Sequence, residues 1–250
     1  MLEITRGIKL NVNGQTGVVT TKTINGKLTQ VPVKLWLTYQ ANSVPASGMM
    51  VNVRDIKAIL IQQITHQNPV CPKTVDLLRW AHNMMSDKFS NCKLIRLKLD
   101  VTETMSMTIK TEDDNMMQLT VKYELAAAHR LWNDQWDHEK NRQVFGKCAN
   151  AAGHGHNYLL EITLQGIADP DTGLLIKRQT LDQIVTKEII EKFDHKNLNA
   201  DCKAFEKLIP TVENMAKVFW DKLIGKFQNA KLNQIRLWET TETYADYKEN

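Results

Sequence analysis

The sequence predicts an α+β protein made of two tandem copies of one unit, each a four-stranded antiparallel sheet with two helices on one face. Two observations predict this fold class. Segments of the second half match segments of the first half in the same order, and in each half two helix patterns lie between two pairs of strand patterns. Helices grouped between strand pairs favour an antiparallel sheet that is covered on one face.

The repeat is visible in three pairs of segments. TGLLIKRQTLDQIV resembles SGMMVNVRDIKAIL, IPTVENMAKVFWDKL resembles CPKTVDLLRWAHNMM, and QIRLWETTETY resembles KLDVTETMSMT. One residue pair marks each match: Gly173 with Gly48, Thr211 with Thr74, and Glu239 with Glu103. The last two offsets are 137 (211 − 74) and 136 (239 − 103). Three matches in the same order, two of them at nearly equal offsets, indicate tandem duplication.

In the first copy, strand patterns at 18–24 and 28–39 flank Asn25-Gly26, a strong hairpin-turn signal. Helical spacing predicts a first helix from four apolar residues: Val53, Ile56, Leu60 and Ile64. A second helix is expected from Thr74, which can cap it after Pro72. Its apolar face comprises Val75, Leu78, Ala81 and Met85. Residues 93–109 are expected to return as one strand, with Ile95, Leu97, Leu99, Val101 and Glu103 on one face.

In the second copy, Thr211 follows Pro210 and is a natural N-cap for the helix after it. The apolar stripe of that helix is typical of a core-facing side: Val212, Met215, Ala216, Phe219, Leu223 and Phe227. The polar turn at 113–115 is the expected junction, giving domains 1–115 and 116–250. Strands of the first domain have Thr, Lys and Leu where the second has its histidines and cysteine, so metal chemistry is expected in the second domain alone.

Composition places the chain among globular proteins. Of 250 residues, 42% are hydrophobic and 24% charged, enough for one large or two small domains. A net charge of +4 with scattered Lys and Arg residues does not indicate nucleic-acid binding. No apolar run approaches the ~18 residues of a membrane span. The four cysteines form no C-x-x-C pair and no signal peptide is apparent, so we expect a cytoplasmic protein with reduced thiols.

The chain is organised around FGKCANAAGHGHNY, which contains Cys148, His154 and His156. Two histidines that are two apart on a strand point to the same face, so both imidazoles can reach one metal ion. His129 ends the inward-facing series of an earlier strand and is the best candidate for a third ligand. Catalytic zinc usually takes three protein ligands and one open position. A lone histidine is more often a core or surface residue than a ligand, but this combination favours a metal site.

These residues resemble the 6-pyruvoyl-tetrahydropterin synthase and 6-carboxytetrahydropterin synthase family. The resemblance rests on AAAHRL, FGKC-x5-HGHNY, DPDTG, FDHKNL, PTVEN and the final ET, and it covers about residues 117–250. It implies the T-fold, a four-stranded antiparallel sheet with two helices on one side that assembles through sheet edges into barrels. The first copy then resembles a degenerate T-fold domain without metal ligands, and the second a catalytic T-fold domain.

The resemblance also implies roles for individual residues. His129, His154 and His156 would bind Zn²⁺, and Glu239 would hold the guanidine-like edge of a pterin. Cys148 would be the general base, and Asp194 and His195 would complete a relay with it. A thiol near a cation ionises more readily, which would suit Cys148 as a base. Neighbouring strand residues point apart, so Asp194 and His195 are expected either to act on different partners or to lie on a turn.

The implied substrate is 7,8-dihydroneopterin triphosphate, with elimination of triphosphate in a carbon–oxygen lyase reaction. Arg130, Lys147 and Lys196 adjoin the motifs and are candidates to hold the phosphates. Cys148 and His154 are six apart (154 − 148), which resembles the enzymes that form the 6-pyruvoyl product. A 6-carboxytetrahydropterin synthase of the queuosine pathway and a non-catalytic zinc- or pterin-binding T-fold protein remain alternatives. Because family active sites lie between subunits, we also expect a homo-oligomer.

Overall fold

The computed structural model describes residues 1–21 and 30–248, which form two compact units. The first unit comprises Met1–Leu119 and Gly166–Leu175, and the second comprises Thr120–Gln165 and Ile176–Asn250. The first unit therefore includes a short segment from the second sequence repeat. The expected domain boundary at 115/116 stays a prediction, but residues 113–115 begin strand β6 (Asp113–His129) and do not form the turn expected there.

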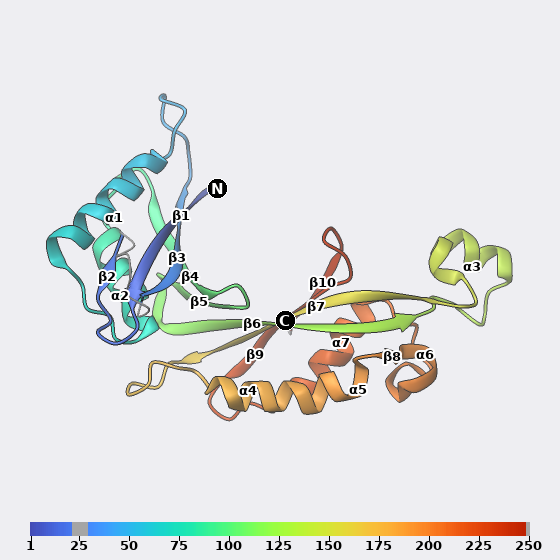
Figure 1. Ribbon diagram of the computed structural model, residues 1–250. Helices are drawn as coiled ribbons and strands as arrows, with labels where there is room; N and C mark the ends of the chain where they lie inside the picture. Colours follow the sequence, from blue (N-terminus) through green and yellow to red (C-terminus); the bar gives the residue numbers. More distant parts are fainter. Residues whose placement is uncertain (22–29, 249–250) are drawn as a thin grey trace. The chain divides into compact units, whose positions relative to one another are not determined.

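The first unit is an antiparallel sheet with two helices on one face (Figure 1). Its strands are β1 (Leu2–Asn13), β2 (Val19–Thr20), β3 (Gln30–Ala41), β4 (Lys93–Thr102) and β5 (Met105–Lys110), in the order β2-β1-β3-β4-β5. Its helices are α1 (Val53–Gln67) and α2 (Thr74–Met85). Leu35 opposes Leu99, and Leu37 opposes Leu97, so alternate residues of neighbouring strands bury the same face.

Two local expectations for the first unit were wrong. Helix α2 begins at Thr74, but the residue before it, Lys73, is the N-cap, and its N–H donates to Asp76 Oδ2 at 3.1 Å. Residues 93–109 form a hairpin rather than one strand, because the chain reverses after Thr102, whose hydroxyl accepts the N–H of Thr104. Helix α1 is confirmed, with Ile56, Leu60 and Ile64 buried as their spacing predicts. The Asn25-Gly26 turn lies outside the described residues.

The second unit repeats this design with longer strands. Its sheet contains β6 (Asp113–His129, of which the part from Thr120 belongs here), β7 (His154–Ile167), β9 (Lys231–Trp238) and β10 (Tyr244–Tyr247). The order is β6-β7-β9-β10, and the short β8 (Lys196–Asn197) pairs parallel with β6. The helices are α3 (His138–Phe145), α4 (Arg178–Val185), α5 (Glu191–Phe193), α6 (Leu198–Asp201) and α7 (Val212–Leu223). A π-helical turn, Thr186–Ile190, joins α4 to α5, and α4, α5 and α7 lie on one face of the sheet (Figure 1).

Helix α7 forms as its sequence predicts. Thr211 is its N-cap, and the threonine side chain accepts the N–H of Asn214 at 3.4 Å. Every residue of its apolar stripe is buried, and the stripe faces a sheet in which Tyr158, Ile235 and Leu237 are also buried. Both units thus have the predicted α+β, T-fold design. Among the described residues, no helix combines the length and apolar character needed to cross a bilayer.

Candidate metal centre and surrounding site

Three histidines meet at one end of the second sheet. His129 is the last residue of β6, and His154 and His156 begin β7. Their ring centroids lie 4.6 to 5.1 Å apart, and their candidate ligand nitrogens all lie within 4.8 Å of one another. Strand alternation turns all three rings toward the helix-covered face, where His129 is fully buried. We call this set the histidine tripod.

The ring of His129 is held in one orientation. Its Nδ1 lies 2.8 Å from the carbonyl oxygen of Pro210, which directly precedes Thr211, and 3.4 Å from the hydroxyl of Tyr158. Because a carbonyl only accepts, Nδ1 must carry the proton, and Nε2 is left with a free lone pair. Burial lowers the pKa of His129 to about 4, the other two histidines add to this, and the Pro210 carbonyl opposes it. The ring is therefore neutral at pH 7, the form that binds metals.

The tripod fits a divalent ion such as Zn²⁺. Zn–N bonds of about 2.0–2.1 Å in a tetrahedral site place ligand nitrogens roughly 3.3 Å apart. His129 Nε2 and His154 Nε2 lie 3.1 Å apart, close to that value. Among the described residues, buried His156 Nε2 has no hydrogen-bond partner, and an unsatisfied ring nitrogen is costly unless it meets an ion or a donor. These features favour a metal over a purely structural histidine cluster.

The buried state of His129 gives a prediction for the metal-free protein. Its pKa is about 4 in the fold and about 6.5 in the unfolded chain, so between these values only the unfolded chain binds the proton. The contribution of neutral His129 to the free energy of unfolding is therefore fully present above pH 6.5. It is expected to fall by about 3 kcal/mol as the pH drops to 4. Urea unfolding of the chelator-treated protein across this range measures the loss. A His129→Gln variant should show a shallower pH dependence, and equal slopes would contradict the prediction.

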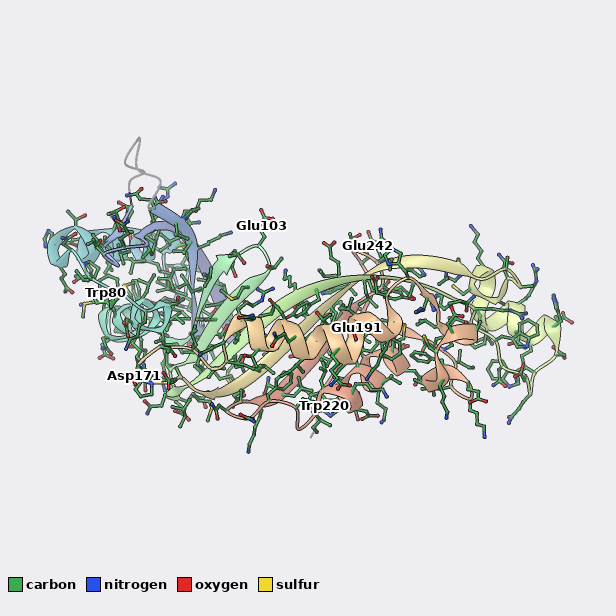
Figure 2. All side chains as sticks on the ribbon, turned by 60° about the horizontal axis from the view of Figure 1, so that its bottom comes forward. Trp80, Glu103, Asp171, Glu191, Trp220 and Glu242 are labelled. Atoms are coloured by element: carbon green, nitrogen blue, oxygen red, sulfur yellow. The ribbon has the colours of Figure 1, made fainter. Side chains whose placement is uncertain are left out.

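Glu239 lies beside the tripod, directly after β9. Its Oε1 is 3.7 Å from both His129 Nε2 and His156 Nε2, and its side chain is 19% exposed. The backbone N–H of Glu239 donates to Thr243, which fixes the residue at the base of the β9–β10 hairpin. Its repeat counterpart Glu103 lies in the turn between β4 and β5, and Figure 2 labels it there. The Glu239 carboxylate therefore lies beside the tripod and is not a fully solvated charge at a strand end.

Cys148 lies in a 3₁₀ turn, Gly146–Ala149, and is half-buried. Burial and, next, the negative charge of Glu239 raise the pKa of its thiol. Its backbone oxygen accepts the N–H of Leu131, which ties the turn to the chain that follows His129. The expectation that a nearby cation promotes ionisation is thus not met by the protein's own charges, because the interacting side chain is a carboxylate. The metal-free thiol is protonated at neutral pH.

Asp194 and His195 form a pair, because they lie on a turn and not along a strand. His195 has a positive φ of 55°, and its Nδ1 lies 2.8 Å from Asp194 Oδ2. The other carboxylate oxygen accepts the N–H of Ala126 at 2.7 Å. Burial alone raises the pKa of Asp194, but the hydrogen bonds from Ala126 and His195 outweigh it and lower the net pKa. Within the residues described, neither member of the pair has a hydrogen bond or ion pair with Cys148.

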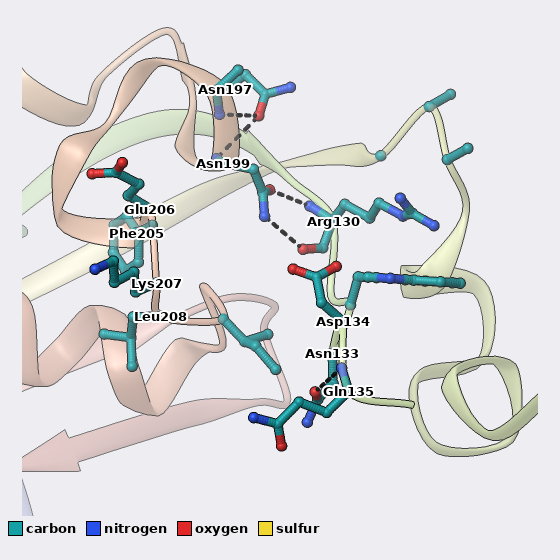
Figure 3. Close-up of a pocket in the computed structure, with 16 residues that line it drawn as sticks. Arg130, Asn133, Asp134, Gln135, Asn197, Asn199, Phe205, Glu206, Lys207 and Leu208 are labelled. Atoms are coloured by element: carbon teal, nitrogen blue, oxygen red, sulfur yellow. Dashed lines mark hydrogen bonds between the residues drawn. The ribbon is translucent and has the colours of Figure 1, made fainter. Parts of the chain in front are cut away.

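Residues 194–199 form a supporting segment alongside β6 that was not predicted from the sequence, and we call it the brace. It runs parallel to the end of β6, from the Asp194 contact with Ala126 through the β8 pairs to Asn199. Asn199 Oδ1 accepts the N–H of Arg130 at 2.7 Å, and its Nδ2 donates to the Arg130 oxygen at 3.0 Å (Figure 3). The Asn199 side chain therefore hydrogen-bonds both the backbone N–H and the backbone carbonyl of Arg130, the residue after His129. It links the Asp194–His195 pair to a tripod ligand.

The brace can be tested with Asn199→Leu, which removes both hydrogen bonds to Arg130. We expect zinc affinity to fall about tenfold, the lower end for residues that support a metal ligand. The apo protein should lose only about 1 kcal/mol, because water can replace the lost partners. Asn199→Asp keeps the acceptor for Arg130 N–H and should lose less affinity. Calorimetric titration with zinc checks this, and unchanged affinity in both variants would rule the brace out.

Two more supporting residues escaped sequence reasoning. Gly153 has a φ of 68°, and a Cβ there would lie 2.8 Å from the oxygen of His129, so only glycine allows β7 to begin so close to β6. Gly155, between the histidines, is less constrained, since its Cβ would meet Ala127 at an ordinary 3.5 Å. Asn141 is fully buried, and its side chain bonds backbone groups of Asn133, Trp136 and Asp137. It thus fixes the loop between the tripod and Cys148.

The candidate phosphate-binding residues differ in how far they are engaged. The guanidinium of Arg130 stacks over Trp132 at 3.9 Å and donates to the Ala149 oxygen, so it already has partners. Lys196 lines a shallow pocket of about 440 Å³ together with His195, His156 and small residues of β6. Lys196 is therefore freer to meet an anion than Arg130.

The fold and the tripod define a T-fold protein with a candidate divalent-metal centre beside a cysteine and a carboxylate. A model of the 6-pyruvoyl tetrahydropterin synthase family matches residues 118–250, more than half of the chain. The chain belongs to this family, whose members include lyases.

Relatives of two kinds match the same half of the chain. The human 6-pyruvoyl tetrahydrobiopterin synthase is 34% identical over 131 residues, 52% of this chain and 90% of the relative. The 6-carboxy-5,6,7,8-tetrahydropterin synthase of Aquifex aeolicus (strain VF5) is 25% identical over 161 residues, 53% of this chain and 98% of the relative. A solved structure of Caenorhabditis elegans 6-pyruvoyl tetrahydropterin synthase has a TM-score of 0.51 at 29% identity, covering 54% of this chain and 96% of its own.

Proposed function

We propose that this protein is a zinc-dependent 6-pyruvoyl-tetrahydropterin synthase that acts on 7,8-dihydroneopterin triphosphate and eliminates triphosphate. The observation that carries the proposal is the histidine tripod with Glu239 3.7 Å from two of its nitrogens. The 32–36% identity of this half to several 6-pyruvoyl tetrahydrobiopterin synthases supports the pyruvoyl product over the carboxy product.

His129, His154 and His156 would hold the ion through their ring nitrogens. When bound there, a divalent ion supplies Lewis-acid stabilisation of negative charge on the substrate and a positive charge that favours the thiolate of Cys148. The Pro210 carbonyl keeps His129 in the tautomer with a free Nε2, so the tripod is preorganised.

Glu239 would orient the substrate. A carboxylate can accept two parallel hydrogen bonds from an N–H/NH₂ edge, which a pterin presents. The hydrogen bond from the backbone N–H of Glu239 to the Thr243 oxygen fixes the backbone from which the carboxylate projects. Substrate held in this way has its side chain directed toward the tripod, where positioning alone contributes several kcal/mol to catalysis.

Cys148 would remove a carbon-bound proton as a thiolate, and the Asp194–His195 pair would pass protons to and from the substrate. The pair is oriented by its hydrogen bond and by Ala126, so the ring of His195 presents Nε2 outward. His195 is 82% exposed and has no bond to Cys148 among the described residues, which suits a pair that completes the site of a neighbouring copy. The proposal therefore includes a homo-oligomer.

The proposal places the enzyme in the cytoplasm. All four cysteines are free, and Cys71, Cys92 and Cys202 are buried as thiols, as expected in a reducing compartment.

The deciding experiment incubates the zinc-loaded protein with 7,8-dihydroneopterin triphosphate and identifies the pterin by mass. Release of triphosphate with a 6-pyruvoyl product supports the proposal. A 6-carboxy product with acetaldehyde would assign the chain to the queuosine-type reaction, which shares these residues. Recovery of unchanged substrate with zinc bound would instead indicate a non-catalytic pterin- or zinc-binding protein.

A further inference from the structure

A turn in the second sequence repeat packs on the start of helix α2 in the first unit. The turn comprises residues 169–173, and Figure 2 labels Asp171 within it. Lys73 donates a hydrogen bond from Nζ to the oxygen of Pro170. A Cβ on Gly173 would lie 2.9 Å from Lys73 Cβ and 3.2 Å from Val75 Cγ1. The contact is thus close enough to require glycine at its centre.

The first repeat carries the same turn, but there it is uncovered. Gly48 has a φ of 74°, against 71° for Gly173, and each glycine N–H donates to a backbone oxygen three or four residues earlier. No atom lies within 4 Å of a Cβ placed on Gly48, whereas Gly173 is buried. Beside Gly48, the apolar side chains of Val44 and Met49 are 43% and 56% exposed. The turn at Gly173 therefore packs on a surface, the start of α2, whereas the turn at Gly48 has no such surface among the described residues.

The repeat also identifies the missing docking surface. Helix α2 starts at Thr74, and its counterpart at an offset of 137 is Thr211, the N-cap of α7. Just before it, Leu208 and Ile209 are half-buried and line an open cavity of about 630 Å³, in which Figure 3 labels Leu208. The start of α7 thus offers partly exposed apolar side chains where the start of α2 receives its turn.

We propose that residues 44–49 of one chain dock on residues 208–212 of a second copy of this chain. The contact would repeat between copies the one that residues 169–173 make with α2 inside one chain. The turn and its receiving surface are different parts of the chain, so the interface is head-to-tail, the type that forms a ring when the rotation between copies closes. The inference rests on the proposed homo-oligomer but not on the proposed reaction. It also places the neighbour's turn beside Pro210, the residue that orients His129.

Cross-linking tests the contact directly. A Met49→Cys, Leu208→Cys double variant of the full chain is oxidised mildly and run on a non-reducing gel. We expect a ladder of disulfide-linked multiples of the chain, whereas each single variant should remain at the mass of one chain. A double variant that forms no linked species would overturn the proposal, because the two thiols would then never meet.

Charge substitution provides an independent test. Met49→Lys is expected to shift the protein to a smaller species in sedimentation velocity, since a lysine would be buried against apolar side chains. The control is Val70→Lys, which changes an equally exposed apolar residue of the first unit and should leave the assembly intact. An unaltered assembly in Met49→Lys would reject this surface while leaving the oligomer standing. If the wild-type protein were a monomer, both the docking surface and the homo-oligomer would be rejected. Pterin turnover by that monomer would show that the reaction needs neither of them.

Discussion

Replacing His156 with alanine is expected to weaken zinc binding by at least about 100-fold and to remove turnover with it. Loss of residues that merely support a ligand already costs 10–100-fold in affinity, and a ligand itself contributes more. His156 is the sharpest choice in the tripod. Its Nε2 has no hydrogen-bond partner among the described residues, whereas His129 is buried and bonded to Pro210. Loss of affinity in the His156 variant therefore reports on the metal and not on a disrupted fold.

The matched control for this variant is His66→Ala. His66 lies in the last turn of α1 in the first unit and is exposed. Zinc content by atomic spectroscopy and affinity by competition with a chromophoric chelator should match the wild-type values in the control. If the His156 variant also kept its zinc, the tripod would not be the metal site.

Sequence periodicity located the tripod but could not explain its orientation. His154 and His156 share a face because strand side chains alternate, and the inward series of β6 ends on His129, which is fully buried. The group that fixes the His129 tautomer is the oxygen of Pro210, 81 residues away. No local pattern predicts such a contact, because every residue offers the same backbone carbonyl. Only the fold determines which carbonyl reaches His129.

The Asp194–His195 pair shows where alternation stops applying. Adjacent residues point apart only along an extended strand, and the positive φ of His195 breaks that geometry and lets the two side chains meet. The β4–β5 hairpin was missed for a related reason. Its turn, around Glu103, contains no Gly, Pro, Asn or Asp, so the signals that mark tight turns were absent. The apolar stripe of α7, by contrast, was fully predictable because helical spacing and burial agree.

Electrostatics around Cys148 could not be derived from the sequence either. The residues nearest in sequence, Lys147 and the histidines, suggest a positive environment that favours ionisation. Folding brings in Glu239 from 91 positions away (239 − 148), and together with burial it raises the pKa of the thiol. Without a bound ion, the protein therefore keeps Cys148 protonated. For Cys148 to act as a thiolate base, positive charge must come from a bound ion and not from the protein's own side chains.

Replacing Cys148 with alanine is expected to lower turnover by about 10²–10⁴-fold, the usual contribution of a general base, without reducing zinc content. The thiol is half-buried in a turn held by the backbone bond to Leu131, so alanine should leave that turn in place. The control is Cys92→Ala, a buried cysteine of the first unit that should keep full turnover.

Zinc and the pH profile then separate the roles of Cys148. If the wild-type thiolate is the base, turnover of the zinc-loaded wild type should rise with pH through the thiol pKa, and the alanine variant should lack that limb. Cys148 is not part of the histidine group whose ligand atoms lie within 4.8 Å of one another, so zinc bound per chain should be equal in the two proteins. A variant that keeps wild-type turnover would remove Cys148 from the mechanism, and one that loses zinc would make the thiol a ligand instead of a base.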